Sequence, residues 1–187
     1  MSKSNFINEF VKSENQVGAI APSSKYLAKK MLAKIDFSTD LNIVELGPGT
    51  GVFTSRLLKR MSSNSKLLSL ELNPYFASMI RKSVQDSRFQ IRCDSAENIN
   101  TVLKQTQFPK VDYIISSLPL AVLPIRLKLR IINECKTALR SDGGFIQFQY
   151  SLNAKDLLHK KFNSVDITFT PLNLPPAFVY HCSFCGP

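Results

Sequence analysis

Long apolar runs, paired metal-binding motifs and internal repeats are all missing from this sequence of 187 residues. No run approaches the ~18 apolar residues that a membrane-spanning helix needs, and no N-terminal signal peptide is visible. We therefore expect a cytoplasmic protein with reduced thiols. Only Cys182 and Cys185 form a C-x-x-C pair. Because no second pair or histidine-rich partner completes a zinc site, we expect no bound metal.

Acidic residues are few beside the basic ones. There are 14 Asp and Glu against 24 Lys and Arg, so the formal net charge is +10. This excess indicates a polyanionic partner, and it fits nucleic acid or an anionic membrane surface unless it serves solubility alone. With 44% hydrophobic and 20% charged residues, the composition is that of a folded chain with one compact core.

Short apolar runs alternate with helical patterns from Leu41 onward, which is typical of an α/β fold with a parallel sheet. We expect strands at 41–46, 66–72, 89–93, 111–116, 143–150, 165–170 and 177–184. Helices are expected at 50–61, at 73–84, from about Pro124, and at 153–161. The last two strands are joined by "PLNLPP" and should form a hairpin. The pattern predicts a Rossmann-like, seven-stranded, mostly parallel sheet flanked by helices.

Residues 1–40 differ in character from the rest. The stretch "SNFINEFVKS" places its apolar side chains on one side of a helix. Ser23 or Ser24 fits as the N-cap of a second helix, "KYLAKKMLAKI". We therefore expect residues 1–40 to form a helical lid or membrane-docking segment, followed by a single structural unit at 41–187.

A glycine-rich turn, "VELGPGTGVF", follows the first predicted strand. A phosphate-binding P-loop needs Gly-Lys-Ser/Thr after its glycines, and here Gly51 is followed by Val52, so that site is excluded. The G-x-G-x-G spacing also departs from the G-x-G-x-x-G of dinucleotide sites. Glu45 comes directly before the glycines, where its charge repels a pyrophosphate but suits a ligand with a cationic amine.

Two further carboxylates end the next strands. Glu71 lies roughly 20 residues after Gly49, where a carboxylate accepts hydrogen bonds from both hydroxyls of an adenosyl ribose. Asp94 ends the third strand and is placed to reach the adenine amino group. S-adenosylmethionine (SAM) accounts for all three carboxylates, because it has an amino-acid part, a ribose and an adenine but no phosphate. The residues expected to bind it are Glu45, Gly47, Gly49, Thr50, Gly51, Glu71, Leu72, Asp94, Ser95, Ala96 and Ser116.

Four motifs occur in order at the ends of the predicted strands, namely "VELGPGTG", "LSLELN", "CDSAEN" and "VDYIISSLPL". In these motifs the sequence resembles the class I SAM-dependent methyltransferases. The resemblance implies a methyl-transferring enzyme whose glycines let the backbone approach the methionine part of SAM closely. A metabolite-binding α/β domain without chemistry is the alternative.

The end of the fourth strand bears on the methyl acceptor. Methyltransferases that act on adenine or glutamine usually carry Asn/Asp-Pro-Pro-Tyr/Phe or Asn-Leu-Pro-Tyr there. Here the run is "SSLPL" (116–120), with a serine in place of the amide and Leu120 in place of the aromatic ring. An adenine would lose its hydrogen bonds and a stacking platform worth roughly 1–3 kcal/mol per base.

Nearly end to end, the chain is similar to the bacterial phospholipid N-methyltransferases, which methylate phosphatidylethanolamine and are related to ribosomal RNA adenine dimethyltransferases. The shared stretches are "FVKSENQVGAIAPSSKYLAKKM", "VELGPGTGVFT", "LELNPYFA", "SSLPL", "GGFIQFQYS" and "NLPPAFVY". The resemblance implies a peripheral enzyme on the inner, cytoplasmic face of the membrane, docked on anionic lipid by its N-terminal helix and basic residues.

Catalytic residues are implied by the same resemblance. Tyr150 in "QFQY" matches the family's active-site tyrosine, and we expect it to orient the amine. We expect Ser116 and Ser117 to line the acceptor slot. Two other functions stay open at this point. One is an RNA (adenine) N-methyltransferase, whose basic residues would contact phosphates. The other is a catalytically silent module that binds SAM or lipid.

Overall fold

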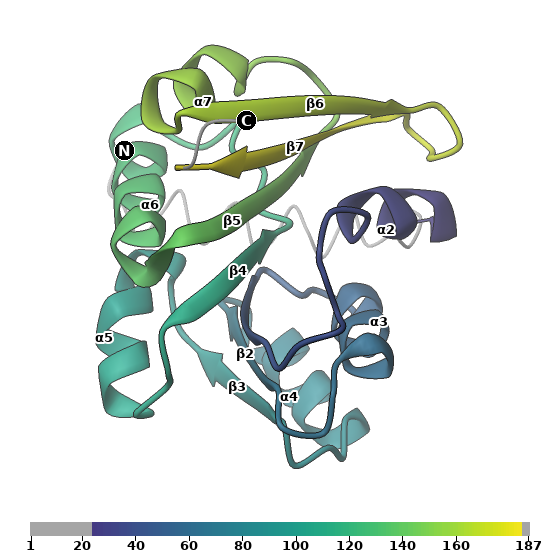
Figure 1. The fold of residues 1–187 in the computed structure, drawn as a ribbon, viewed down its shortest axis with the longest axis vertical. Coiled ribbons are helices and arrows are strands. Elements are labelled where there is room, and N and C mark those ends of the chain that lie inside the picture. The colour runs from purple at the N-terminus through teal and green to yellow at the C-terminus, as the bar shows by residue number, and fades with distance from the viewer. Residues whose placement is uncertain (1–23, 185–187) are drawn as a thin grey trace.

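The computed structural model describes residues 24–184, and residues 1–23 and 185–187 lie outside the described part. A single sheet with the strand order β3-β2-β1-β4-β5-β7-β6 forms its centre (Figure 1). The strands are β1 (Asn42–Leu46), β2 (Lys66–Glu71), β3 (Phe89–Cys93), β4 (Val111–Ser116), β5 (Leu139–Gln149), β6 (Ser164–Thr170) and β7 (Ala177–Ser183).

Strand directions follow the predicted pattern. All neighbours from β3 to β5 are parallel. The last strand in sequence, β7, pairs antiparallel with both β5 and β6. The structure therefore confirms the Rossmann-like, seven-stranded, mostly parallel sheet and its C-terminal hairpin.

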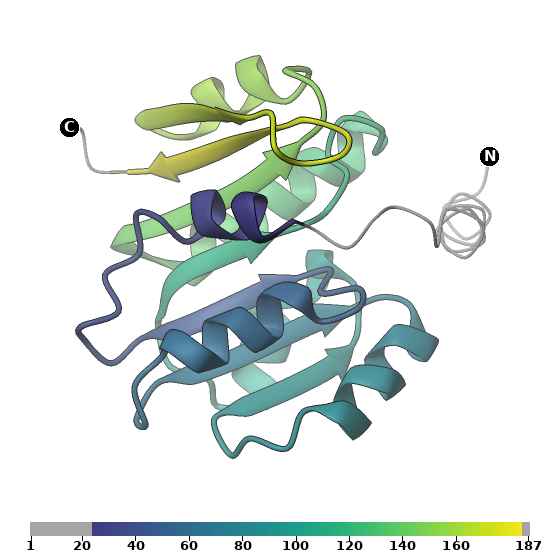
Figure 2. The same cartoon turned by 90° about the vertical axis from the view of Figure 1, so that its right-hand side faces the viewer.

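Helices cover both faces of the sheet (Figures 1 and 2). One face carries α2 (Lys25–Met31), α3 (Val52–Arg60) and α4 (Pro74–Ser83). The other carries α5 (Ile99–Gln105), α6 (Ile125–Ala138) and α7 (Lys155–Lys161). The strands between these layers are buried on both faces, which explains why β1 and β2 read as continuous apolar runs.

Local sequence signals account for two helix starts. Asn73 caps α4, accepting a hydrogen bond from the Tyr75 N–H at 2.9 Å, and Pro74 occupies the first turn as predicted. Ser24 caps α2, with its hydroxyl oxygen accepting from the Leu27 N–H at 3.1 Å. The other helix predicted in residues 1–40, "SNFINEFVKS", lies outside the described residues, and the division at residue 40 stays a prediction.

The sequence analysis was wrong in two places. It missed α5, a helix of seven residues whose only buried side chains are Ile99 and Val102, too few to show a helical period. It also placed the start of β5 at residue 143, whereas the strand begins at Leu139. The register between β4 and β5 shifts there, so the polar and glycine residues that indicated a turn lie inside an irregular strand.

Asp112 joins the first residues of three strands. From β4, its Oδ2 accepts the Asn42 N–H of β1 at 2.7 Å, and its Oδ1 accepts from Arg140 Nη1 of β5 at 2.8 Å. We expect Asp112→Ala to lower the free energy of unfolding by about 1–3 kcal/mol, because the Asn42 N–H loses its acceptor. Urea denaturation measures this. The matched control is Asp142→Ala, which removes an exposed carboxylate from the same arginine. An equal loss in both variants would contradict this role of Asp112.

Candidate functional site

Backbone hydrogen bonds hold the loops together where β1 to β4 end. In each bond, the N–H of the residue directly after one strand donates to a carbonyl at the end of the neighbouring strand. The bonds are Gly47 N–H to Leu70 O at 2.9 Å, Asp94 N–H to Glu71 O at 3.1 Å and Ser117 N–H to Leu46 O at 2.9 Å. The four sequence motifs therefore meet at one edge, the carboxyl edge of the parallel strands. This is the edge at which open α/β sheets bind ligands.

The glycine-rich turn adopts a backbone that other residues rarely tolerate. Gly47, Gly49 and Gly51 have φ values of 68°, 53° and 80°. A Cβ atom on Gly47 would lie 3.1 Å from the Leu118 side chain, so this loop packs closely on the "SSLPL" loop. Gly51 is also the N-cap of α3. Thr50, the remaining predicted residue of the turn, is exposed at its tip.

Glu71 bridges the glycine turn and the start of α4. Its Oε2 accepts the Gly49 N–H at 3.1 Å, and its Oε1 accepts the Asn73 N–H at 2.8 Å. Burial raises the pKa of Glu71, and these backbone donors act in the opposite direction. The carboxylate thus lies directly beside the glycine turn, as the predicted ribose contact requires.

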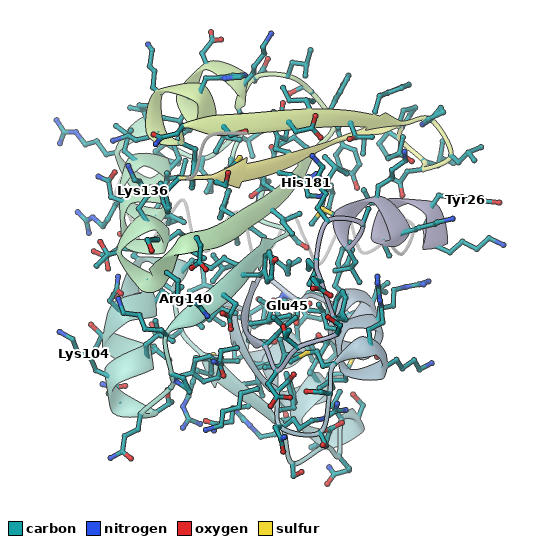
Figure 3. The ribbon with its side chains drawn as sticks, viewed as in Figure 1. Tyr26, Glu45, Lys104, Lys136, Arg140 and His181 are labelled. Carbon is teal, nitrogen blue, oxygen red and sulfur yellow. The ribbon has the colours of Figure 1, made fainter. Side chains whose placement is uncertain are left out.

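Glu45 lies in the interior of the protein, deeper than a residue at the end of a strand before the glycine turn was expected to lie (Figure 3). The residue is fully buried, and its Oε2 accepts from Thr54 Oγ1 and Ser69 Oγ, both at 2.7 Å. Its Oε1 has no hydrogen-bond partner within residues 24–184. Burial raises the pKa of Glu45 to about 7, while the two hydroxyl groups lower it. A buried carboxyl with one unpaired oxygen fits a ligand that brings a donor, and the cationic amine of SAM is such a donor.

Asp94 follows β3 and is half-buried. Its Oδ1 accepts from the Ser95 N–H and from Asn98 Nδ2, both at 2.7 Å. Ser95 in turn caps the 3-10 turn at Ala96–Asn98. The Ala96 side chain packs in the core, whereas the Leu72 side chain is exposed beside the site. The structure therefore brings the predicted adenosine-side residues to the same edge as the glycine turn.

The "SSLPL" loop after β4, which the sequence analysis predicts to line the acceptor site, is held by two glutamines that the sequence analysis missed. The Leu118 carbonyl accepts from Gln147 Nε2 at 2.9 Å and from Gln149 Nε2 at 2.8 Å. Gln149 also accepts the Ala121 N–H at 3.0 Å. Ser116 is buried, and its hydroxyl oxygen accepts the Leu118 N–H at 3.3 Å. The alternation in "IQFQ" could have indicated that the two glutamines act together, because residues two apart in a strand share one face.

Tyr150 directly follows β5 at the carboxyl edge, near the predicted acceptor residues. Ser116 of β4 is paired with Gln147, three positions before this tyrosine. The Tyr150 ring packs edge-on against Phe148, with centroids 5.6 Å apart, and the side chain is 40% exposed. Burial raises the pKa of Tyr150, and a side-chain hydrogen bond with Asn173 lowers it. The phenol is therefore protonated at neutral pH.

Large apolar side chains surround this edge. We call them the apolar rim; each is between 45% and 77% exposed, and they are Tyr75, Val122, Ile125, Leu152, Leu172 and Leu174. They follow the ends of β2, β4, β5 and β6. The end of β6 belongs to this edge because β6 and β5 are both antiparallel to β7. Exposed apolar groups gathered around a site mark a surface for an apolar partner.

Neither a metal cluster nor a membrane span occurs in the described part of the chain. Within residues 24–184, no three His, Cys, Asp or Glu side chains are grouped to hold a metal. No helix there is both long and apolar enough to cross a bilayer. Cys93, Cys135 and Cys182 are free, and burial raises the pKa of the last two thiols. Cys185 of the C-x-x-C pair lies outside the described residues.

The sequence is similar to those of known proteins. The family model described as ribosomal RNA adenine dimethylase matches residues 22–119. An ornithine lipid N-methyltransferase of Singulisphaera acidiphila is 27% identical over 179 residues, which are 95% of this chain and 93% of that protein. A probable ribosomal RNA small subunit methyltransferase A of Methanosarcina mazei is 28% identical over 96 residues, half of this chain but 31% of that protein.

The fold has solved counterparts. Human methyltransferase-like protein 13, in complex with SAH, superposes with a TM-score of 0.66 at 15% identity, covering 86% of this chain and 80% of that one. At this identity the likeness shows the fold alone. The family model, which covers more than half of the chain, shows the family. This chain belongs to the ribosomal RNA adenine dimethylase family and is a SAM-dependent methyltransferase of the class I fold.

Proposed function

We propose that this enzyme methylates the amine of a membrane lipid head group, and that phosphatidylethanolamine-type phospholipids are its substrates. The apolar rim carries the proposal. Six large apolar side chains are exposed around the edge where the cofactor and acceptor loops meet. Such exposure is unfavourable in water but suits an enzyme whose substrate sits in a lipid surface.

The extent of the sequence matches supports a lipid acceptor. The ornithine lipid N-methyltransferase aligns over 95% of this chain, whereas the ribosomal RNA adenine dimethylase model ends at residue 119. Tyr150 and the C-terminal hairpin lie beyond that point. Leu120, at the position where adenine methyltransferases carry an aromatic ring, is only 1% exposed in the core. It therefore offers no face on which a base can stack.

Cofactor binding is assigned to the loops that meet at the carboxyl edge. SAM carries the methyl group on a sulfonium, and its amino-acid part fits beside the unpaired Glu45 Oε1. Glu71 would accept hydrogen bonds from the ribose hydroxyls, and Asp94 is placed for the adenine amino group. The other contacts are assigned to Gly47, Gly49, Thr50, Gly51, Leu72, Ser95, Ala96 and Ser116. Most contacts with the glycine turn would be through backbone.

Methyl transfer to an amine needs positioning more than acid–base groups, because the lone pair attacks the methyl carbon in line. The head-group amine arrives as an ammonium and must first lose a proton to solvent water. Tyr150 is a protonated phenol at neutral pH, so we assign it to orienting the amine through its ring and oxygen, not to removing the proton. Ser116 and Ser117 are assigned to the walls of the acceptor slot.

Membrane contact is proposed to be peripheral, on the cytoplasmic face. The formal net charge of +10 attracts anionic lipid, and the apolar rim would enter the head-group layer. Residues 1–40 are proposed to assist as a docking segment or lid. Of this segment the structure describes residues 24–40, in which α2 packs on the sheet through Leu27, Ala28 and Met31.

The Glu45 assignment predicts a pH dependence of cofactor binding. With its pKa at about 7, Glu45 is mostly protonated at pH 5.5 and half ionised at pH 7. A cationic amine favours the ionised form, so SAM affinity should rise by up to about fifteenfold between these pH values, which lie below the ordinary α-amino pKa of about 7.7–8.0. Isothermal titration calorimetry measures this. Glu45→Gln should bind more weakly at pH 7 and lose the pH dependence, and an equally steep dependence in that variant would refute the assignment.

The acceptor is tested by incubating the full chain with methyl-labelled SAM. One sample contains vesicles of phosphatidylethanolamine with an anionic phospholipid, a second contains ornithine lipid vesicles, and a third contains RNA without lipid. We expect label on the lipid amine and none on RNA. Label on RNA alone would overturn the lipid proposal, and SAM binding without transfer to any acceptor would favour a silent module.

A double variant of the apolar rim tests whether the rim contacts lipid. Leu172→Ser combined with Leu174→Ser removes two exposed side chains, at 61% and 77% exposure, that no cofactor assignment uses. Their loss should lower turnover on vesicles and leave SAM affinity unchanged. Unaltered turnover on vesicles would count against the rim as a lipid contact.

A further inference from the structure

Gln147 has an unpaired hydrogen-bond acceptor beside the "SSLPL" loop. Its side chain is fully buried, and its Oε1 has no hydrogen-bond partner within residues 24–184. A buried amide oxygen without a donor is unfavourable, and such a group calls for an explanation. None of the cofactor assignments uses this atom. A donor from a bound ligand or an ordered water would satisfy it.

The orientation of the Gln147 amide is fixed by its own donors. Nε2 donates to the Leu118 carbonyl at 2.9 Å and to the Phe148 carbonyl at 2.6 Å. An amide nitrogen carries two N–H groups, so both are used. Exchanging the oxygen and the nitrogen would direct Oε1 at two carbonyl oxygens. The unpaired atom is therefore the acceptor oxygen.

Gln149 makes the same donor contacts, but its oxygen is used. Its Nε2 donates to the Leu118 carbonyl at 2.8 Å and to the Phe148 carbonyl at 2.6 Å. Its Oε1 accepts the Ala121 N–H at 3.0 Å. The two glutamines hold the loop through the same two carbonyls and differ in what their oxygens bind. Holding the loop therefore does not account for the Gln147 oxygen.

The Gln147 amide lies where the acceptor loop meets the cofactor turn. Gln147 is paired with Ser116, the last residue of β4, and the carbonyl that it binds belongs to Leu118. Leu118 in turn packs against Gly47. A carbonyl oxygen has two lone pairs, and the two glutamines occupy both at Leu118. The Leu118 carbonyl is thus taken, whereas the Gln147 oxygen is free to accept from a substrate.

We propose that Gln147 Oε1 accepts an N–H of the acceptor amine and so favours the first two methyl transfers to a lipid amine over the third. This rests on the proposed function, because the acceptor is taken to be a lipid head-group amine. A neutral primary amine has two N–H groups, a monomethyl amine has one and a dimethyl amine has none. Only the first two acceptors can therefore make the contact.

The chemistry of the transfer strengthens this hydrogen bond as the reaction proceeds. The nitrogen lone pair forms the bond to the methyl carbon of SAM, while the S–C bond breaks and its electron pair stays on sulfur. Because the nitrogen gains positive charge, its N–H becomes a stronger donor to Oε1 in the transition state. After the first or second transfer, an N–H proton passes to solvent water. The third transfer gives a quaternary ammonium without an N–H, so the contact does not assist it.

The test compares three lipids with the full chain. Vesicles of an anionic phospholipid contain phosphatidylethanolamine, its N-monomethyl derivative or its N,N-dimethyl derivative, and initial rates with methyl-labelled SAM give kcat/KM. Gln147→Met replaces the amide by an apolar chain of similar length. Its kcat/KM should fall at least about tenfold more on the first two lipids than on the dimethyl lipid. The matched control, Gln149→Met, removes the same donor contacts and should lower all three values by a similar factor.

A second variant, Gln147→Glu, keeps an acceptor oxygen and loses the amide donors. It should retain the wild-type ratio of kcat/KM between the monomethyl and dimethyl lipids, which Gln147→Met lowers. This ratio does not depend on the fraction of folded enzyme, because both rates come from one sample. A ratio lowered as far in Gln147→Glu as in Gln147→Met would overturn the proposal.

Equal losses on all three lipids in Gln147→Met would also overturn it, because the amide would then only hold the loop or bind an internal water. If the wild type methylates none of the three lipids, the proposed function fails and this inference falls with it. That result is distinct from equal losses beside an active wild type, which would refute the role of Gln147 alone.

Discussion

The site depends on the carboxylate of Glu71, which accepts hydrogen bonds from two different loops. It joins the N–H of Gly49, in the turn after β1, to the N–H of Asn73, where α4 begins. The turn has three residues at positive φ and little regular hydrogen bonding of its own, so it needs a partner outside itself to hold one shape. Glu71 supplies that partner from the neighbouring strand, and it brings a carboxyl group to the place where we propose that the ribose of SAM is bound.

A second set of contacts organises the acceptor side in a similar way. Gln147 and Gln149 reach from β5 to the Leu118 carbonyl, and Leu118 in turn packs against Gly47 of the cofactor turn. The cofactor and acceptor loops are therefore in direct contact. Rigid placement of both reactants is the chief means by which a protein accelerates an in-line methyl transfer. The residues of the apolar rim follow the strand ends at the same edge, where we propose that the lipid is bound.

Local patterns in the sequence were enough to predict the mostly parallel, seven-stranded sheet and its C-terminal hairpin. They also predicted the Asn73 cap and the grouping of Glu45, Glu71 and Asp94 at one edge. Contacts between distant side chains were not predictable. The bonds from Gln147 and Gln149 to Leu118, and from Asn173 to Ser24, join residues that share no local period. Helix α5 was missed because its buried face holds only two residues. The depth of Glu45 follows from Thr54 and Ser69, which surround it only after folding.

Calorimetric titration of SAM into the wild type and into Glu71→Gln tests the central claim most directly. Glutamine keeps the size of the side chain and one acceptor oxygen, but it cannot accept from both ribose hydroxyls. The account predicts that affinity for SAM falls at least about tenfold, and that the thermal midpoint without ligand also falls because the Gly49 or the Asn73 N–H loses its acceptor. The control Glu134→Gln, in α6, should bind SAM as the wild type does. Wild-type affinity in Glu71→Gln would contradict the account.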